Sequence, residues 1–272
     1  MPKPRVLILR APGTNCDVET AFAFEVAGAA PNVWHLNRLL EKPAAAADFQ
    51  ILCIPGGFSY GDDIAAGRIF GNQIRHHLAD VVGEFKAAGK LILGICNGFQ
   101  VLIKSGVLLS DLSGSGTAPA GPRLADAALW PATLTWNDTG RFEDRWVRLA
   151  VTGDRCFFLR GITRMYLPMA HAEGKFVARD ADILGMLDRN GQIPLRYATA
   201  GGDTRHVPYP DNPNGAQLSA AGVCDETGRV LGLMPHPERH LDPTNHPRWT
   251  RGEAGEVGDG LKVFQNAVEY FA

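Results

Sequence analysis

Residues 91–98 read LILGICNG, an apolar run that ends at a cysteine set between two glycines. A strand that runs into Gly-x-Cys-x-Gly is the cysteine form of the nucleophile elbow, a sharp strand-to-helix turn that exposes its nucleophile. In open α/β folds such a turn lies at the carboxyl edge of the sheet, where sites form. The turn also places Cys96 at a helix N-terminus, where the helix dipole favours the thiolate. The stretch therefore predicts an α/β fold with a cysteine nucleophile.

A second apolar run supplies a candidate base for this cysteine. Residues 230–234 read VLGLM, and His236-Pro237-Glu238 follow them closely. A nucleophilic cysteine needs a proton acceptor, and that base needs an orienting carboxylate. Two residues apart at a strand end, His236 and Glu238 can point into one cleft. The sequence therefore predicts acyl transfer with Cys96, His236 and Glu238 as catalytic residues.

The rest of the chain predicts a mostly parallel sheet with helices on both faces, plus additional antiparallel strands. Apolar strands alternate with helices over the first hundred residues, and the next hundred are strand-rich. The expected strands are Arg5–Leu9, Val33–Leu36, Gln50–Ile54, Leu91–Ile95, Trp146–Leu149, Cys156–Leu159, Lys175–Ala178, Ile183–Leu187 and Val230–Met234, with a hairpin turn at Arg189–Gln192. The expected helices are Asp17–Ala29, one helix of about twenty residues within Ala65–Ala88, Asn97–Lys104 and Leu261–Phe271. Residues 110–131 read as a loop or insertion and 241–260 as an irregular segment, within a single domain over 1–272.

Composition excludes several classes of function. The chain has 272 residues, 45% apolar and 21% charged, with a formal net charge of −2 and no basic run, so nothing favours nucleic acid as a partner. No stretch reaches the length of a membrane helix. The five cysteines are scattered without a C-x-x-C pair, so neither a disulfide framework nor a metal site is predicted. These features predict a cytoplasmic protein.

The other cysteines and histidines are weaker candidates for catalytic roles. Cys16 stands near a predicted helix start and is the competing nucleophile, but it lacks paired glycines and an obvious base. His171 with Glu173 is a weaker alternative to His236 with Glu238, because its strand is less convincing. The remaining cysteines read as core residues. The remaining histidines read as surface or turn residues, namely His35, His76, His77, His206, His240 and His246.

Residues 55–62, PGGFSYGD, form a glycine-rich loop that lacks the ending of a phosphate-binding loop. Glycines beside an elbow suit an oxyanion hole, where backbone N–H groups approach a developing charge. The alternative is an ordinary strand-to-helix turn. No ATP site is recognisable in the sequence.

These motifs together resemble the class I (triad) glutamine amidotransferases. The resemblance rests on Gly94-x-Cys96-x-Gly98-x-Gln100 and the downstream His236-Pro237-Glu238. Longer strings narrow it to the branch formed by glutaminase subunits of phosphoribosylformylglycinamidine synthase, in purine synthesis. These strings are PGGFSYGD (55–62), NDTGRFE (137–143), HAEG (171–174), YPDNPNG (209–215) and MPHPER (234–239).

The resemblance implies roles for residues around the elbow. It implies Cys96 as nucleophile, His236 as base and Glu238 as its orienter. It implies oxyanion donors or substrate contacts from Gly56, Gly57, Phe58, Asn97 and Gln100, and pocket support from His171 and Glu173. It further implies L-glutamine as substrate and no cofactor in this chain. ATP and Mg²⁺ are expected on a synthase subunit that is the partner, with a small third subunit as a further component.

Three alternatives stay open at this point. Another amidotransferase of the same fold would feed a different acceptor, although the longer strings argue against it. In the protease-like and chaperone-like branch of the fold a histidine follows the nucleophile directly, where this chain has Asn97. A catalytically silent scaffold subunit is the third, and the intact Cys96, His236 and Glu238 argue against it.

Overall fold

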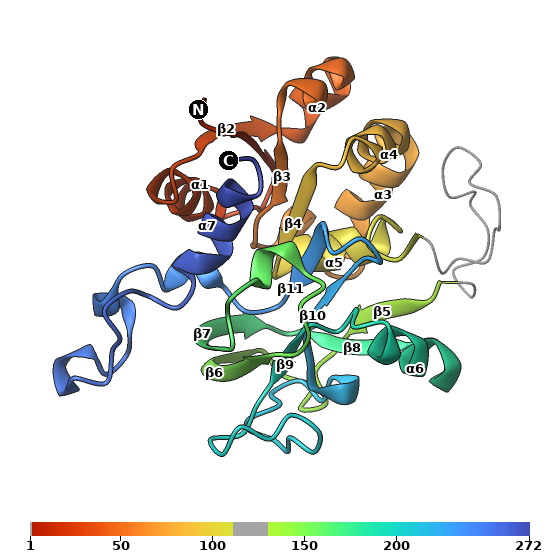
Figure 1. Ribbon diagram of the computed structural model, residues 1–272. Coiled ribbons are helices and arrows are strands. Elements are labelled where there is room, and N and C mark those ends of the chain that lie inside the picture. The colour runs from red at the N-terminus through yellow and green to blue at the C-terminus, as the bar shows by residue number, and fades with distance from the viewer. Residues whose placement is uncertain (1, 111–129) are drawn as a thin grey trace.

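The computed structural model describes residues 2–110 and 130–272, which are built around one nine-stranded sheet (Figure 1). The strands lie in the order β2-β1-β3-β4-β11-β10-β9-β6-β7. Their bounds are β1 (Arg5–Arg10), β2 (Ala30–His35), β3 (Ile51–Ile54), β4 (Leu91–Ile95), β6 (Glu143–Val151), β7 (Arg164–His171), β9 (Leu195–Tyr197), β10 (Ala220–Cys224) and β11 (Val230–Leu233). A separate antiparallel pair joins β5 (Ala132–Thr135) to β8 (Lys175–Ala178).

The sheet has a parallel half and an antiparallel half. Strands β2, β1, β3, β4 and β11 pair in parallel, whereas β10, β9, β6 and β7 continue the sheet in antiparallel pairs. Every residue of β3, β4 and β11 is buried, which explains why these strands read as continuous apolar runs. The predicted mixed sheet is therefore confirmed. Because Ile95 lies opposite Leu233, the two motif-bearing strands end side by side at one edge.

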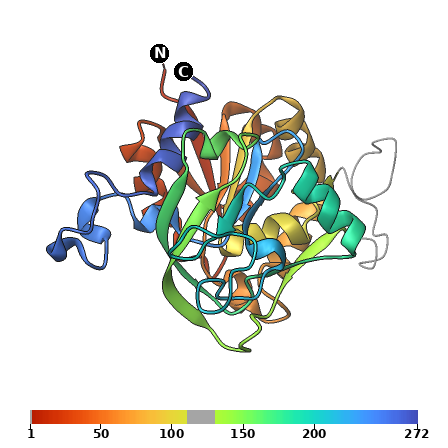
Figure 2. The same cartoon turned by 60° about the horizontal axis from the view of Figure 1, so that its bottom comes forward.

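Helices cover both faces of the parallel half. The helices are α1 (Asp17–Val26), α2 (Leu36–Glu41), α3 (Arg68–His77), α4 (Ala79–Ala87), α5 (Asn97–Lys104), α6 (Ala181–Arg189) and α7 (Leu261–Glu269). Figure 1 shows α1 and α7 on one side of these strands and α3, α4 and α5 on the other. Phe24 of α1 and Phe264 of α7 pack edge to face, with ring centroids 5.0 Å apart. Both termini lie close together beyond this helix pair (Figure 2).

The single helix predicted within Ala65–Ala88 is two helices, α3 and α4. Leu78 leaves the helical region, with φ −128° and ψ 11°, and separates them. Its side chain is buried together with Ile74 and Phe85, one from each helix. A one-residue break that keeps the same apolar face buried does not show in the spacing of apolar residues.

Two predicted strands are helical. Ile183–Leu187 belongs to α6, because the Asp180 side chain caps the helix by accepting from the Ile183 backbone N–H at 2.8 Å. The predicted hairpin at Arg189–Gln192 is the end of α6, where Gly191 adopts φ +67°. Cys156–Leu159 is also wrong as a strand: it contains a short 3₁₀ helix, in which the Phe158 carbonyl accepts from the Asn266 side chain of α7.

The irregular segment 241–260 contains two short 3₁₀ helices and projects beyond the helices in both views (Figures 1 and 2). His240 and His246, predicted as surface or turn residues, are not surface residues, since they are 2% and 9% exposed, but each directly follows a short 3₁₀ helix. Both rings pack against Trp146 of β6, and the His246 ring also packs against Tyr166 of the neighbouring strand β7.

Most of the predicted loop at 110–131 lies outside the described residues. That residues 1–272 form a single domain stays a prediction. None of the helices described is long and apolar enough to cross a membrane.

Candidate active site

Cys96 stands on a strained turn between β4 and α5. Its backbone has φ 51° and ψ −104°, a conformation that costs a residue with a side chain about 1–3 kcal/mol. The neighbouring glycines make this turn possible. A Cβ on Gly98 would lie 1.9 Å from the Ile54 carbonyl oxygen, and one on Gly94 would lie 2.6 Å from the Gly98 carbonyl oxygen. The two glycines therefore let the start of α5 pass directly over the ends of β3 and β4.

His236 and Glu238 form a buried pair just after β11. The His236 Nδ1 lies 2.6 Å from the Glu238 Oε1, and their side chains are 2% and 0% exposed. Burial by itself lowers the pKa of His236, but Glu238, followed by Cys96 and Cys16, raises it well above its ordinary value. Its Nε2 has no hydrogen-bond partner among the residues the structure describes. This arrangement leaves one ring nitrogen of an oriented imidazole available beside the sulfur.

Strand β7 holds both arms of this site in place. The Cys96 thiol lies 3.6 Å from the Ala170 carbonyl oxygen, and the His236 backbone N–H donates to the Pro168 carbonyl at 2.8 Å. The strand has only a weak signal in the sequence and is not among the strands predicted there. It links the nucleophile and the base although neither residue belongs to it.

Cys16 lies in the same site, which the sequence did not predict. A Cβ on Gly56 would lie 3.0 Å from the Cys16 sulfur and 2.8 Å from the His236 Cε1, so the two side chains meet there. The Cys16 sulfur accepts a hydrogen bond from Arg239 at 3.2 Å. Burial raises the pKa of the Cys16 thiol, although His236 and Arg239 act in the opposite direction. The imidazole thus has a sulfur neighbour besides Cys96.

The loop after β3 lies next to the elbow and carries the predicted oxyanion residues. Gly57 has φ +138°, and any Cβ there would lie 2.7 Å from the Asn15 backbone nitrogen. The Phe58 N–H donates to the Gly13 carbonyl oxygen at 3.0 Å and is therefore not available as an oxyanion donor. Phe58 is 45% exposed. The N–H groups of Gly57 and Asn97 have no acceptor in the part of the chain that is described. These two are the available oxyanion donors.

The side chains of Asn97 and Gln100 form a buried amide chain. Asn97 accepts from the Ser59 N–H at 3.2 Å and donates to the Gln100 carbonyl oxygen at 2.9 Å. Gln100 then donates to the Glu173 backbone carbonyl at 2.7 Å and is 3% exposed. Both polar ends of Gln100 are thus occupied by protein. It connects the elbow helix to the turn after β7.

Glu173 takes part in a buried ion pair with Lys104. The Lys104 Nζ lies 3.3 Å from the Glu173 carboxylate and donates to the Ala66 carbonyl oxygen at 2.7 Å. The Ala66 N–H donates in turn to Glu173 at 3.1 Å. Burial lowers the pKa of Lys104, and Glu173 opposes that shift. The pair fixes α5, the turn after β7 and the loop before α3 to one another.

We expect Lys104→Ala to lower the free energy of unfolding by about 3–5 kcal/mol, because it leaves the Glu173 carboxylate buried without its counter-ion. Urea unfolding measures this change. Lys262→Ala is the matched control, since its pair with Glu269 is exposed and worth about 0–1 kcal/mol. Equal losses in the two variants would contradict the assignment.

His171 is held in its neutral form. Burial, and then the charge of His236, lower the pKa of His171 to about 3. Its Nδ1 lies 3.2 Å from the Asn137 Oδ1, which also accepts from the Gly174 N–H at 3.1 Å. Asn214 donates to the Gly174 carbonyl at 2.9 Å. The NDTGRFE and NPNG strings therefore supply the amides that hold the 171–174 turn in place.

A metal-type grouping coincides with this site. Ligand atoms of Cys16, Glu19, His236 and Glu238 all lie within 4.8 Å of one another. The Arg239 guanidinium already donates to Glu19 at 2.8 Å and to Cys16. A cation would have to displace this arginine, so we assign the group to the nucleophile's surroundings.

Comparison with known proteins agrees with this geometry. A family model described as a CobB/CobQ-like glutamine amidotransferase domain matches residues 3–271. The phosphoribosylformylglycinamidine synthase subunit PurQ of Dehalococcoides mccartyi is 45% identical over 271 residues, covering 99% of this chain and 98% of the relative. The same subunit of Methanococcus maripaludis is 40% identical, with 98% of each chain covered. A solved structure of PurLQS from Thermotoga maritima matches with a TM-score of 0.71 and 31% identity, over 99% of this chain and 100% of that one.

The fold and the elbow site, with this family match, define a glutamine amidotransferase. The full-length relatives make the assignment narrower. The chain belongs to the family of PurQ subunits of phosphoribosylformylglycinamidine synthase. The alternatives of a different acceptor and of the protease-like branch are thereby set aside.

Proposed function

We propose that the chain is the glutaminase subunit of a phosphoribosylformylglycinamidine synthase and delivers ammonia to a separate synthase subunit. The observation that carries this is the strained Cys96 beside the buried His236–Glu238 pair, next to two unengaged backbone N–H groups. Such a set suits nucleophilic attack on an acyl carbonyl, as in an amide.

In the proposed reaction the Cys96 thiolate attacks the side-chain amide carbon of glutamine. The N–H groups of Gly57 and Asn97 stabilise the oxyanion of the tetrahedral intermediate. The protonated His236, oriented by Glu238, gives its Nε2 proton to the departing ammonia. The γ-glutamyl thioester that remains is cleaved by water, which His236 deprotonates, and glutamate leaves.

The ammonia needs a protected path to its acceptor, because in water near neutral pH it becomes ammonium and loses its nucleophilic electron pair. The proposed partner is a synthase subunit that binds ATP, Mg²⁺ and formylglycinamide ribonucleotide, while this chain uses no cofactor. A small third subunit completes the assembly, and the complex works in the cytoplasm. The relatives support this scheme, since one solved structure is of a PurLQS assembly. The decisive experiment is glutamine-dependent amidination of formylglycinamide ribonucleotide by this chain with its native partners.

We expect a glutamine-derived diazo-ketone to label Cys96 and spare Cys16. Only Cys96 lies beside the open N–H groups that stabilise the adduct's oxygen, whereas Cys16 is held by Arg239 and has a raised pKa. Peptide mapping by mass spectrometry identifies the modified thiol. Cys16→Ala should be labelled as the unsubstituted chain is, and an adduct on Cys16 would reverse the assignment.

We also expect kcat for glutamine to rise at least tenfold, about 1.4 kcal/mol of transition-state stabilisation, when the loaded synthase is added. Hydrolysis without a loaded synthase would waste glutamine. A backbone flip in the glycine loop at 56–57 could make or remove an oxyanion donor, and docking of the synthase could control it. Free ammonia, supplied as a concentrated ammonium salt, should drive the synthase without this chain. An isolated chain that is already at full speed would rule out this coupling.

A further inference from the structure

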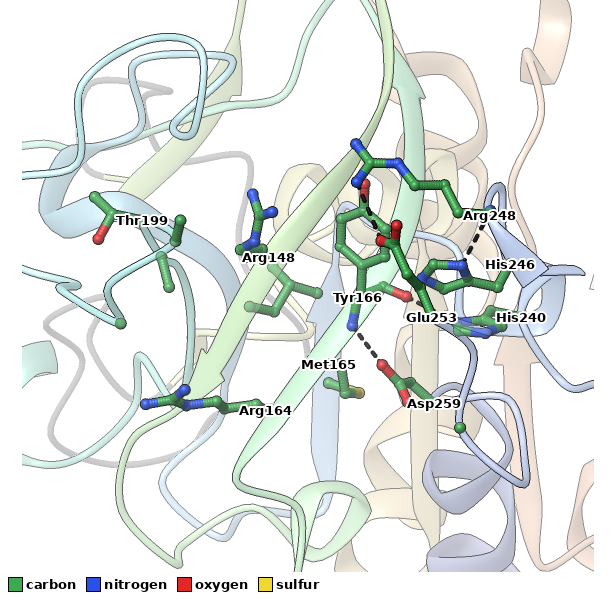
Figure 3. Close-up of a pocket in the computed structure, with 15 residues that line it drawn as sticks. Arg148, Arg164, Met165, Tyr166, Thr199, His240, His246, Arg248, Glu253 and Asp259 are labelled. Carbon is green, nitrogen blue, oxygen red and sulfur yellow. Dashed lines mark hydrogen bonds and ion pairs between the residues drawn. The ribbon is translucent and has the colours of Figure 1, made fainter. Parts of the chain in front are cut away.

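A cavity of about 440 Å³ lies against the outer face of β6 and β7, beneath the segment 240–259 (Figure 3). None of Cys96, His236 and Glu238 lines it, so it is distinct from the glutaminase site. Its size falls within the range of small-molecule sites in proteins.

Two arginines from neighbouring strands open onto this cavity. Arg148 of β6 lies opposite Tyr166 of β7, and Arg164 lies two residues before Tyr166, so all three share one face of the ladder. The Arg148 guanidinium lies 5.6 Å from the centre of the Tyr166 ring, with its nearest carboxylate, Asp211, at 4.0 Å. Arg164 forms no ion pair within residues 2–110 and 130–272. The Arg164 guanidinium therefore has no counter-ion in this part of the structure, and the long contact of Arg148 with Asp211 leaves N–H groups of Arg148 open to a ligand.

The acidic residues that line the cavity are already engaged. Glu253 pairs with Arg248 at 3.1 Å, as Figure 3 shows. Asp259 accepts from the Tyr166 backbone N–H at 2.7 Å. Neither carboxylate pairs with Arg148 or Arg164, so the residues that line the cavity carry more arginines than carboxylates, and Asp211, which pairs with Arg148, lies outside that lining.

The two histidines of the cavity add a buried nitrogen that lacks a partner. The His246 Nδ1 accepts from the Arg248 N–H at 3.1 Å, so the neutral ring carries its proton on Nε2 as a donor. The His240 Nδ1 donates to the Tyr166 carbonyl at 2.8 Å, and its Nε2 has no partner in the described structure. His240 is only 2% exposed. This buried ring nitrogen has hydrogen-bonding capacity that no described protein group uses.

We propose that this cavity binds a phosphate-bearing small molecule with a planar ring. Guanidinium forks match phosphate oxygens, and Arg148 and Arg164 present two of them from adjacent strands. Tyr166 and His246, whose rings pack against each other with centroids 5.4 Å apart, both line the cavity and offer aromatic surface to the ring of a nucleotide. The cavity is separate from the glutaminase site, so a negative result for binding in the cavity does not bear on glutamine hydrolysis, nor the reverse.

Isothermal titration of the full-length chain with ATP and with inorganic pyrophosphate tests the proposal. Both should bind at one site, ATP more tightly, and adenosine should bind weakest because it lacks phosphate. The double variant Arg148→Gln, Arg164→Gln should lose at least about tenfold in affinity for both anions. Arg189→Gln, an exposed arginine on α6 away from the cavity, is the matched control and should bind as the unsubstituted chain does.

A second measurement uses the unsubstituted protein. Saturation with ATP should shift the NMR signals of the His240 and His246 rings and leave those of the exposed His76 and His77 unchanged. The absence of saturable binding, affinity that survives in the double variant, or unmoved His240 and His246 signals would each overturn the proposal. Tighter binding of an oligoglutamate peptide than of ATP would overturn it in favour of an acidic protein segment.

Discussion

Cys96→Ala is expected to reduce glutamine hydrolysis to the uncatalysed background. No other residue can form the thioester, since Cys16 lies beside His236 but is held by Arg239 and has its pKa raised by burial. Glutamate release in the presence of the synthase measures the loss. The synthase supplied with ammonium should keep its activity with this variant, which separates a chemical defect from failed assembly.

The matched control for this variant is Cys16→Ala, which removes a thiol of the same size from the same site. It should keep most of the glutaminase activity. If Cys16→Ala is the inactive variant and Cys96→Ala is not, the nucleophile has been assigned to the wrong cysteine.

His236→Ala is expected to lower kcat for glutamine by about 10² to 10⁴, because it removes the proton donor to ammonia and the base for water. The loss should be far larger than in His171→Ala. With a pKa of about 3, His171 is a neutral imidazole near neutral pH and cannot act as the acid that protonates ammonia. Single-turnover thioester formation and steady-state ammonia release measure the two steps.

Glu238→Gln should lose less than His236→Ala. The glutamine can still contact the His236 Nδ1 and orient the ring, but it no longer raises the pKa of His236. Its profile of kcat against pH should therefore move to lower pH for the step in which His236 acts as acid.

Equal losses in the His236 and His171 variants would leave the base unassigned.

The parts of the site that were predictable from sequence are those that local pattern encodes. The elbow needs glycines beside Cys96 for steric reasons, and His236 and Glu238 stand two residues apart after one strand, so both features can be read within a few positions. The Lys104–Glu173 pair and the place of Cys16 could not be read in this way. Their partners lie 69 and 223 positions away, and no short pattern records such contacts.

The fold divides in the same manner. Strands β3, β4 and β11 are buried on both faces and give unbroken apolar runs, so the parallel half was predictable. The short run Ile183–Leu187 suits a strand or a helix equally, and the cap at Asp180 decides for the helix. Strand β7 alternates buried and half-buried residues and includes a proline, which weakens its apolar signal.

The backbone conformation at Cys96 creates a trade-off between catalytic activity and thermal stability at a single position. Its φ of 51° is open to glycine at little cost, but a side chain there is strained by about 1–3 kcal/mol. Free energies of unfolding are only about 5–15 kcal/mol, so the strain at this one residue lowers the stability of the fold by a sizeable fraction of that total. A variant of the chain that did not need to catalyse the reaction would become more stable if glycine replaced this cysteine. Selection for heat tolerance alone would therefore tend to erase the catalyst first.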